Sequence, residues 1–99
     1  MPIAEKMREI AARVGSEHVY RTVYDENLCV LVPGKEDISD DILKTFSRID
    51  FAGKSVVDLG CNFGFFTFYA ARLGASEVVG VDRERGVLQG CEVLKRHFN

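Results

Sequence analysis

Two aspartates and a glycine-rich turn carry the clearest chemical signal in this sequence. Asp58 precedes the turn that contains Gly60 and Gly64, in the segment VVDLGCNFG, and Asp82 ends the later segment VVGVD. A carboxylate at the end of a strand can accept hydrogen bonds from the hydroxyls of a ribose. Gly60 permits a sharp turn that exposes backbone groups to a ligand, and Gly64 permits close packing against the next helix. This pattern predicts a nucleotide-binding site.

The elements that must position these residues are two strands of a parallel sheet, each followed by a helix. Ser55 to Leu59 and Val78 to Val81 are short, apolar and β-branched, as strands buried on both faces are. Phe65 to Leu73 is predicted to be a helix that Gly74 closes. A last helix is predicted from one apolar stripe, formed by Val87, Leu88, Cys91, Leu94 and Phe98. Ligands bind beyond the carboxyl ends of such strands, where both aspartates are expected.

The residues before this unit are predicted to form a helix, a β-hairpin and a second helix. Residues 3 to 14 are amphipathic at helical spacing, and Gly15 is expected to end that helix in the left-handed conformation. Residues 18 to 24 and 28 to 32 indicate two strands joined by a turn. Ser39 is expected to cap the second helix. We therefore divide the chain into a cap region, residues 1–50, and an incomplete β-α-β-α half domain, residues 51–99.

The predicted fold class is α/β, a partial Rossmann-like parallel sheet with an N-terminal helix and a β-hairpin. Two strands and two helices of a parallel sheet cannot close a core. The helix from Phe65 to Leu73 is apolar nearly all round, so it requires cover on more than one side. We interpret the chain as a fragment of a larger domain. Self-association through the open sheet edge is the alternative, because exposed strand edges tend to pair.

The order of strand, DxGxxxG turn, helix, strand and acid resembles motif I and the acidic loop of class I S-adenosylmethionine-dependent methyltransferases. The resemblance covers residues 54 to 98, a little under half of the chain. The segment LGCNFGFFTFYAARLGASEVVGVDR is also similar to the corresponding segment of enzymes that modify the wobble uridine of tRNA, which have an LGCNxG turn.

The cofactor that this resemblance implies is S-adenosylmethionine. Asp58 would lie near the methionine amino end, and the turn would line the methionine and the ribose. Asp82 would hold the ribose hydroxyls, Arg83 would lie beside the adenine, and Phe63 is within reach of ligand or substrate. The residues predicted to bind the cofactor are Asp58, Gly60, Cys61, Asn62, Phe63, Gly64, Asp82 and Arg83.

The main alternative is an NAD(P)- or FAD-binding domain of an oxidoreductase. Its fingerprint GxGxxG has a glycine two positions after the first, where this chain has Asn62. Asp58 would repel a pyrophosphate but attract the ammonium group of S-adenosylmethionine, which carries no phosphate. The sequence therefore favours a methyltransferase as the parent enzyme, with this chain alone inactive. A non-catalytic truncated fragment is the alternative from another functional class.

The composition of the chain restricts the possible binding partners less than the DxGxxxG motif does. The net charge of −2 gives no general attraction to nucleic acid or membranes, and no apolar run approaches the ~20 residues of a membrane span. The three cysteines and two histidines do not cluster like zinc ligands, so no metal site is expected. Reduced thiols indicate a cytoplasmic protein. The methyl acceptor, RNA or a small molecule, and the catalytic residues are not identified by the sequence.

Overall fold

The structure is a computed structural model, and it describes residues 1–98. The helices and strands in chain order are α1 (Ile3–Val14), the 3₁₀ turn η1 (Ser16–His18), β1 (Val23–Tyr24), β2 (Val30–Val32), α2 (Asp40–Ser47), β3 (Ser55–Leu59), α3 (Phe65–Arg72), β4 (Glu77–Val81) and α4 (Arg85–Phe98). The predicted fold class, a partial α/β parallel sheet preceded by a helix and a hairpin, is confirmed. None of the helices in the described part of the chain is long and apolar enough to cross a membrane.

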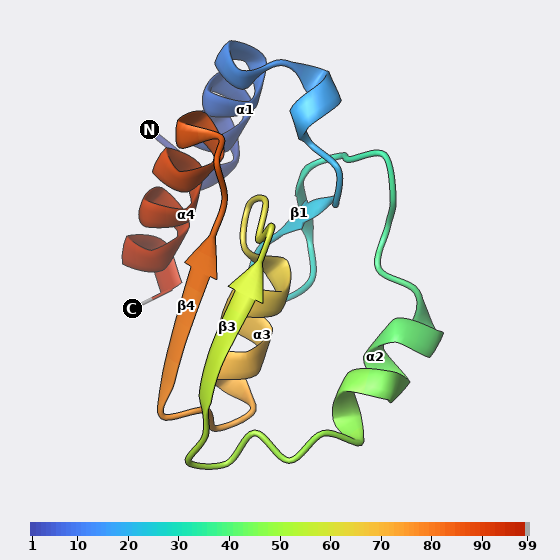
Figure 1. The fold of residues 1–99 in the computed structure, drawn as a ribbon. Coiled ribbons are helices and arrows are strands. Elements are labelled where there is room, and N and C mark those ends of the chain that lie inside the picture. Colours follow the sequence, from blue (N-terminus) through green and yellow to red (C-terminus); the bar gives the residue numbers. More distant parts are fainter. Residues whose placement is uncertain (99) are drawn as a thin grey trace.

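The sheet that positions the candidate site consists of β3 and β4, which are parallel and in full register. Ser55 pairs with Glu77 at one end and Leu59 with Val81 at the other, so both strands end at the same edge. Helix α3 packs against both strands, whereas α4 packs chiefly against α1 (Figure 1). The parallel register therefore places the ends of VVDLG and VVGVD side by side.

The prediction that both strands are buried on two faces is wrong, because one face of each strand is exposed. The face toward α3 is half-buried, but the opposite face is exposed at Val57 (62%), Leu59 (79%), Val79 (45%) and Val81 (45%). The reason is that α3, which packs against both strands, covers only one face of the sheet (Figure 1). Pairing of a second copy at this sheet stays a prediction.

The hydrophobic core lies between α1, the hairpin and α4 rather than over the sheet. Met7, Val87 and Leu94 are almost fully buried there, and Phe63 inserts its ring from the glycine-rich turn. The core thus joins residues from both regions into which we divided the chain. Its members are Met7, Ile10, Ala11, Val19, Val23, Leu31, Val32, Phe63, Val87 and Leu94.

The hairpin is confirmed, but its first strand is shorter than the alternating pattern of residues 18–24 suggested. Residues 16–18 form a 3₁₀ turn, and the backbone of Val19 and Tyr20 accepts hydrogen bonds from Lys35 and Glu36. The carbonyl groups of Val19 and Tyr20 are therefore hydrogen-bonded to residues beyond β2, and only Val23–Tyr24 pairs with β2. Gly15 ends α1 as expected, but with φ 99° and ψ 140° it is not in the left-handed helical conformation.

Helix α2 begins where the sequence indicated. The Ser39 hydroxyl accepts a hydrogen bond from the Ile42 N–H, which satisfies one of the free donors of the first turn. No residue of α2 is fully buried, and an important contact is the stacking of Phe46 on Phe66 of α3, with ring centroids 4.6 Å apart. The helix therefore rests on α3 through aromatic side chains.

Gly90 shows why α4 carries a glycine in its interior. A Cβ atom at this position would lie 2.5 Å from Cε1 of Phe63 and 3.2 Å from Cε of Met7, both buried. Alanine favours a helix over glycine by about 1 kcal/mol, so the absence of a side chain reflects packing, not propensity. Gly90 is the place where α4 accommodates the ring of the turn residue Phe63.

We expect Gly90→Ala to destabilise the protein despite the better helix propensity of alanine. Overpacking of a filled core costs about 1–3 kcal/mol, which outweighs the gain in propensity. Urea denaturation followed by circular dichroism measures the change in the free energy of unfolding. Gln89→Ala, at the neighbouring exposed position of α4, is the control and should change stability by less than about 0.5 kcal/mol. An increase in stability for Gly90→Ala would contradict this packing.

Candidate functional site

The turn after β3 folds back onto the end of β4. The N–H groups of Gly60 and Cys61 both donate to the carbonyl oxygen of Val81, at 2.7 and 2.9 Å. Gly60 has a φ of +69°, and a Cβ atom there would meet nothing, so glycine is favoured at this position by backbone conformation alone. At Gly64, in contrast, a Cβ atom would lie 2.9 Å from the ring of Phe68 in α3. This agrees with the prediction that Gly64 permits close packing against that helix.

The Asp82 carboxylate joins this turn to the loop after β4. One oxygen accepts a hydrogen bond from the Asn62 N–H at 3.0 Å, and the other accepts one from the Glu84 N–H at 2.9 Å. Each carboxylate oxygen keeps further acceptor capacity, which a ribose hydroxyl can use. Asp82 is only half-buried. The Asp82 carboxylate therefore links the two loops and remains accessible as a hydrogen-bond acceptor.

Asp58 lies on the face of the sheet that α3 covers, and the hydroxyl of Thr67 donates to its carboxylate at 2.8 Å. Gly80 stands opposite Asp58 on β4. A Cβ atom at Gly80 would lie 2.9 Å from the Thr67 hydroxyl and 3.0 Å from the Cys61 sulfur, so glycine makes room for this hydrogen bond.

Thr67 and Gly80 help to position a site carboxylate, although neither was among the residues predicted for the site. Two signals could have found them. Thr67 is a small polar residue within the largely aromatic run of the helix FFTFYAAR, and a glycine inside a strand often marks a close approach.

The thiols of Cys61 and Cys91 meet beneath the turn. Their sulfur atoms lie 3.5 and 3.2 Å from the carbonyl oxygen of Asn62. Burial raises the pKa of Cys61, and the negative charges of Asp58 and Asp82 raise it further. Burial is also the main reason that the pKa of Cys91 is raised, followed by its proximity to Cys61. These thiols are therefore poor nucleophiles.

Most of the residues predicted to bind the cofactor come together at this edge. Asp58, Asp82 and the turn from Gly60 to Gly64 surround the two strand ends, and the exposed Arg83 follows directly. Phe63 differs, because its side chain is only 3% exposed and lies in the core against Gly90. Only its backbone can therefore face a ligand. Whether these residues bind a cofactor stays a prediction.

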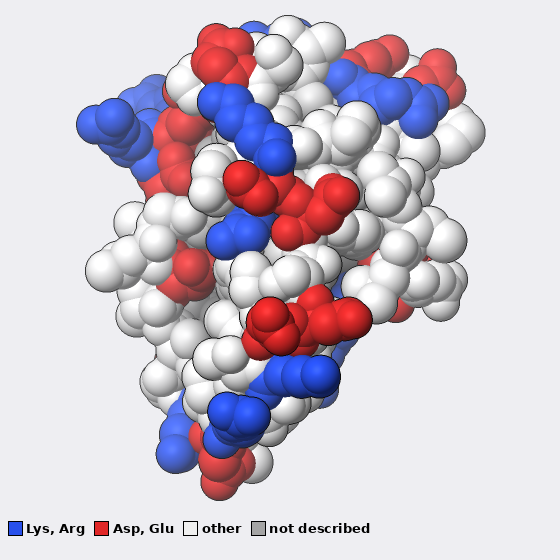
Figure 2. Space-filling view, turned by 90° about the vertical axis from the view of Figure 1, so that its right-hand side faces the viewer, with Lys and Arg blue, Asp and Glu red and all other residues white. Residues whose placement is uncertain are grey.

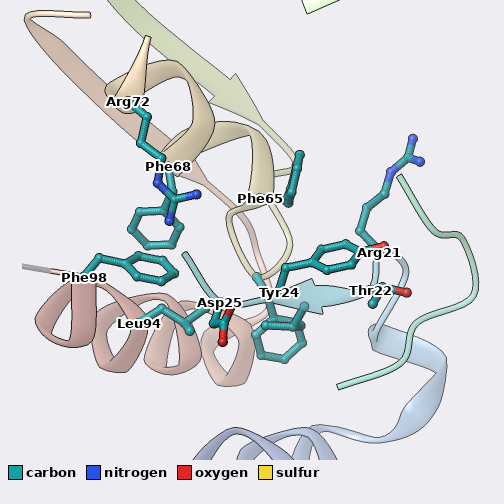
Figure 3. A pocket seen from close by; sticks show the side chains of 11 residues that line it. Arg21, Thr22, Tyr24, Asp25, Phe65, Phe68, Arg72, Leu94 and Phe98 are labelled. Atoms are coloured by element: carbon teal, nitrogen blue, oxygen red, sulfur yellow. The ribbon is translucent and has the colours of Figure 1, made fainter. Parts of the chain in front are cut away.

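The structure has two hollows near this unit, and the larger one begins at Cys61 and Gly64 of the glycine-rich turn. A cavity of about 20 Å³, room for roughly one water, is enclosed by β1, α3 and α4, with Tyr24, Phe68 and Leu94 among its walls (Figure 3). A groove of about 770 Å³ runs between α3, α4 and β4, from Cys61 to Lys95. Neither Asp58 nor Asp82 lines either of them. The two carboxylates therefore lie outside both hollows, whereas Cys61 and Gly64 line the larger one.

A parallel β-α-β-α unit with a glycine turn and a carboxylate from each strand at one edge is typical of half of a Rossmann-like domain. Comparison with known proteins makes this class more specific. Residues 40–98 match the family model described as FtsJ-like methyltransferase, and the chain belongs to this family. The resemblance to class I methyltransferases is thereby confirmed, and an oxidoreductase is not favoured. The narrower similarity to enzymes of the tRNA wobble uridine stays a prediction.

Several curated relatives are named ribosomal protein L11 methyltransferase. The protein of Alteromonas mediterranea is 49% identical over 50 residues, which cover 50% of this chain and 17% of the relative. Those of Vibrio campbellii and Aeromonas hydrophila are 38% and 40% identical over 47 residues, 48% of this chain and 16% of each relative. The match thus spans less than a fifth of these relatives. No solved structure matches the chain significantly.

We expect iodoacetamide to modify Cys29 well before Cys61 and Cys91 in the folded protein. Cys29 is exposed, whereas the other two thiols are shielded and their raised pKa values keep them protonated at pH 8. Peptide mass spectrometry over time gives the three rates, which should rise with pH for the shielded pair. In urea the rates should converge. A native Cys61 that reacts as fast as Cys29 would contradict the geometry beneath the turn.

Proposed function

We propose that this chain binds S-adenosylmethionine and forms the cofactor site of an enzyme that transfers its methyl group to an acceptor. The observation that carries the proposal is the pair of carboxylates at one sheet edge, with Asp82 held between the turn and the next loop. Membership of a methyltransferase family supports the reaction class. A cytoplasmic location belongs to the same proposal.

The hydrogen bonds of the turn favour this ligand over a dinucleotide. A pyrophosphate site requires free backbone N–H groups, which cradle the phosphate oxygens. Here the N–H groups of Gly60, Cys61, Asn62 and Gly64 all donate to acceptors within the protein. Such a turn offers carbonyl and carboxylate oxygens rather than donors, which suits an ammonium group and ribose hydroxyls.

The roles of the two carboxylates follow from their positions. Asp82, with acceptor capacity left on both oxygens, would hold the ribose hydroxyls. Asp58, oriented by Thr67, would attract the ammonium group of the methionine part. The bound cofactor supplies a sulfonium methyl group that an acceptor displaces in line, and the residues of this chain contribute by positioning it.

The acceptor classes that we retain are RNA and a small molecule, and the name of the relatives adds a ribosomal protein. Acidic and basic side chains lie next to one another on the face shown in Figure 2, where neither sign dominates. This face has no extended basic surface of the kind that binds RNA nonspecifically. On this face, the charge pattern gives no support for a general electrostatic attraction to nucleic acid.

We expect S-adenosylhomocysteine to bind the wild-type chain in a calorimetric titration and NAD not to bind. Asp82→Ala removes the ribose acceptor and leaves the N–H groups of Asn62 and Glu84 unpaired, so its affinity should fall by about 10- to 100-fold. The affinity of Asp82→Asn, which retains one acceptor oxygen, should lie between those of the wild type and Asp82→Ala.

The control for this titration is Asp41→Asn, an equal change of charge at an exposed position of α2, which should leave the affinity unchanged. Circular dichroism verifies that each variant is folded. Binding of NAD alone, or an unchanged affinity in Asp82→Ala, would refute the proposed site.

A further inference from the structure

The N-terminal turn between α1 and β1 lies at the same edge as the candidate cofactor site. The side-chain amide of Asn62 donates a hydrogen bond to the carbonyl oxygen of His18 at 2.6 Å, across 44 residues of sequence. In Figure 1 this part of the chain lies at the end of the molecule toward which β3 and β4 point. A segment remote in sequence is thus attached to the glycine-rich turn.

The same turn also faces the loop after β4. The His18 imidazole Nε2 lies 4.0 Å from a carboxylate oxygen of Glu84 and 3.7 Å from one of Glu17. The Glu84 N–H is bound to Asp82, the residue expected to hold the ribose. His18 therefore bridges the two loops between which the adenosyl group is expected.

A close contact between helices holds the turn in this place. A Cβ atom at Gly86, in the first turn of α4, would lie 2.3 Å from Cγ2 of Val14, the last residue of α1. Any larger side chain at Gly86 would push the end of α1, and the turn that follows it, away from the site.

Asn62 connects these parts in a conformation that glycine would adopt more easily. Its φ is +51°, its N–H is bound to Asp82, and its carbonyl oxygen accepts from both thiols beneath the turn. Its side-chain Oδ1 is buried without a hydrogen-bond partner. The bond to His18 is the interaction that a glycine in this position would lose.

We propose that the turn Gly15–His18 is a third wall of the adenosyl site and that Asn62 is the positioning residue that holds it there. This inference rests on the proposed function. The turn contacts the glycine-rich turn through the Asn62 amide and the Glu84 loop through His18, so His18 is the residue expected nearest the ribose and adenine. Ligand affinity therefore depends on a segment outside the β-α-β-α unit.

The first test is Asn62→Gly, which keeps the backbone conformation and removes only the side chain. Affinity for S-adenosylhomocysteine should fall at least fivefold. In the wild type the ligand should slow hydrogen exchange at the amides of His18 and Val19, which are bonded within the N-terminal turn. In Asn62→Gly this protection should disappear, while protection of residues 60–64 remains.

The second test moves the turn without changing the cofactor loop. Gly86→Ala should weaken binding of S-adenosylhomocysteine at least threefold, because the new methyl group displaces Val14. Val14→Ala in the same chain makes room for that methyl group and should restore most of the affinity. A purely structural contact would change the melting temperature in these variants but not the affinity.

The outcomes separate this inference from the proposed function. If the wild type does not bind S-adenosylhomocysteine at all, both are overturned. If the wild type binds and residues 60–64 are protected, the proposed function stands. The third wall is then overturned when His18 and Val19 exchange at unchanged rates and Asn62→Gly and Gly86→Ala bind as tightly as the wild type.

Discussion

The geometry of the strand ends depends on the hydrogen bonds that the Asp82 carboxylate accepts. One side chain satisfies the N–H of Asn62 in the turn after β3 and the N–H of Glu84 in the loop after β4. Without it, two partly buried donors would be left unpaired, which costs about 1–3 kcal/mol for each group. The parallel register of the strands brings the two loops to one edge, and Asp82 then fixes them relative to each other.

The internal hydrogen bonds of the turn determine what chemistry this edge can support. Because the Val81 carbonyl and the Asp82 carboxylate already occupy the N–H groups of Gly60, Cys61 and Asn62, few donors remain for an anionic phosphate. The groups that remain are acceptors, with Asp58 oriented by Thr67. A ligand with hydroxyl and ammonium groups is complementary to such a surface. The same interactions that stabilise the fold thus support an adenosyl ligand without phosphates.

The sequence predicted local structure better than the contacts between distant segments. Residues 55–59 formed the expected strand because β-branched apolar residues favour a sheet. The predicted order of strand, helix and parallel strand placed Asp82 at the same edge as Asp58. Burial of both strand faces was wrong, since no periodicity reveals what covers a sheet. The bond of Asn62 to His18 was not predictable, because it depends on how segments 44 residues apart pack. A polar residue in an apolar helix marked Thr67, but not the carboxylate to which it donates.

The most direct test of the central claim, an adenosyl site at the carboxyl ends of β3 and β4, is a two-dimensional ¹H–¹⁵N NMR titration of the chain with S-adenosylhomocysteine. We expect the largest shifts at the amides of residues 60–64 and 82–84, the two loops that the Asp82 carboxylate joins. Shifts concentrated instead on the groove between α3 and α4, at Ala71, Leu88 and Lys95, would contradict it.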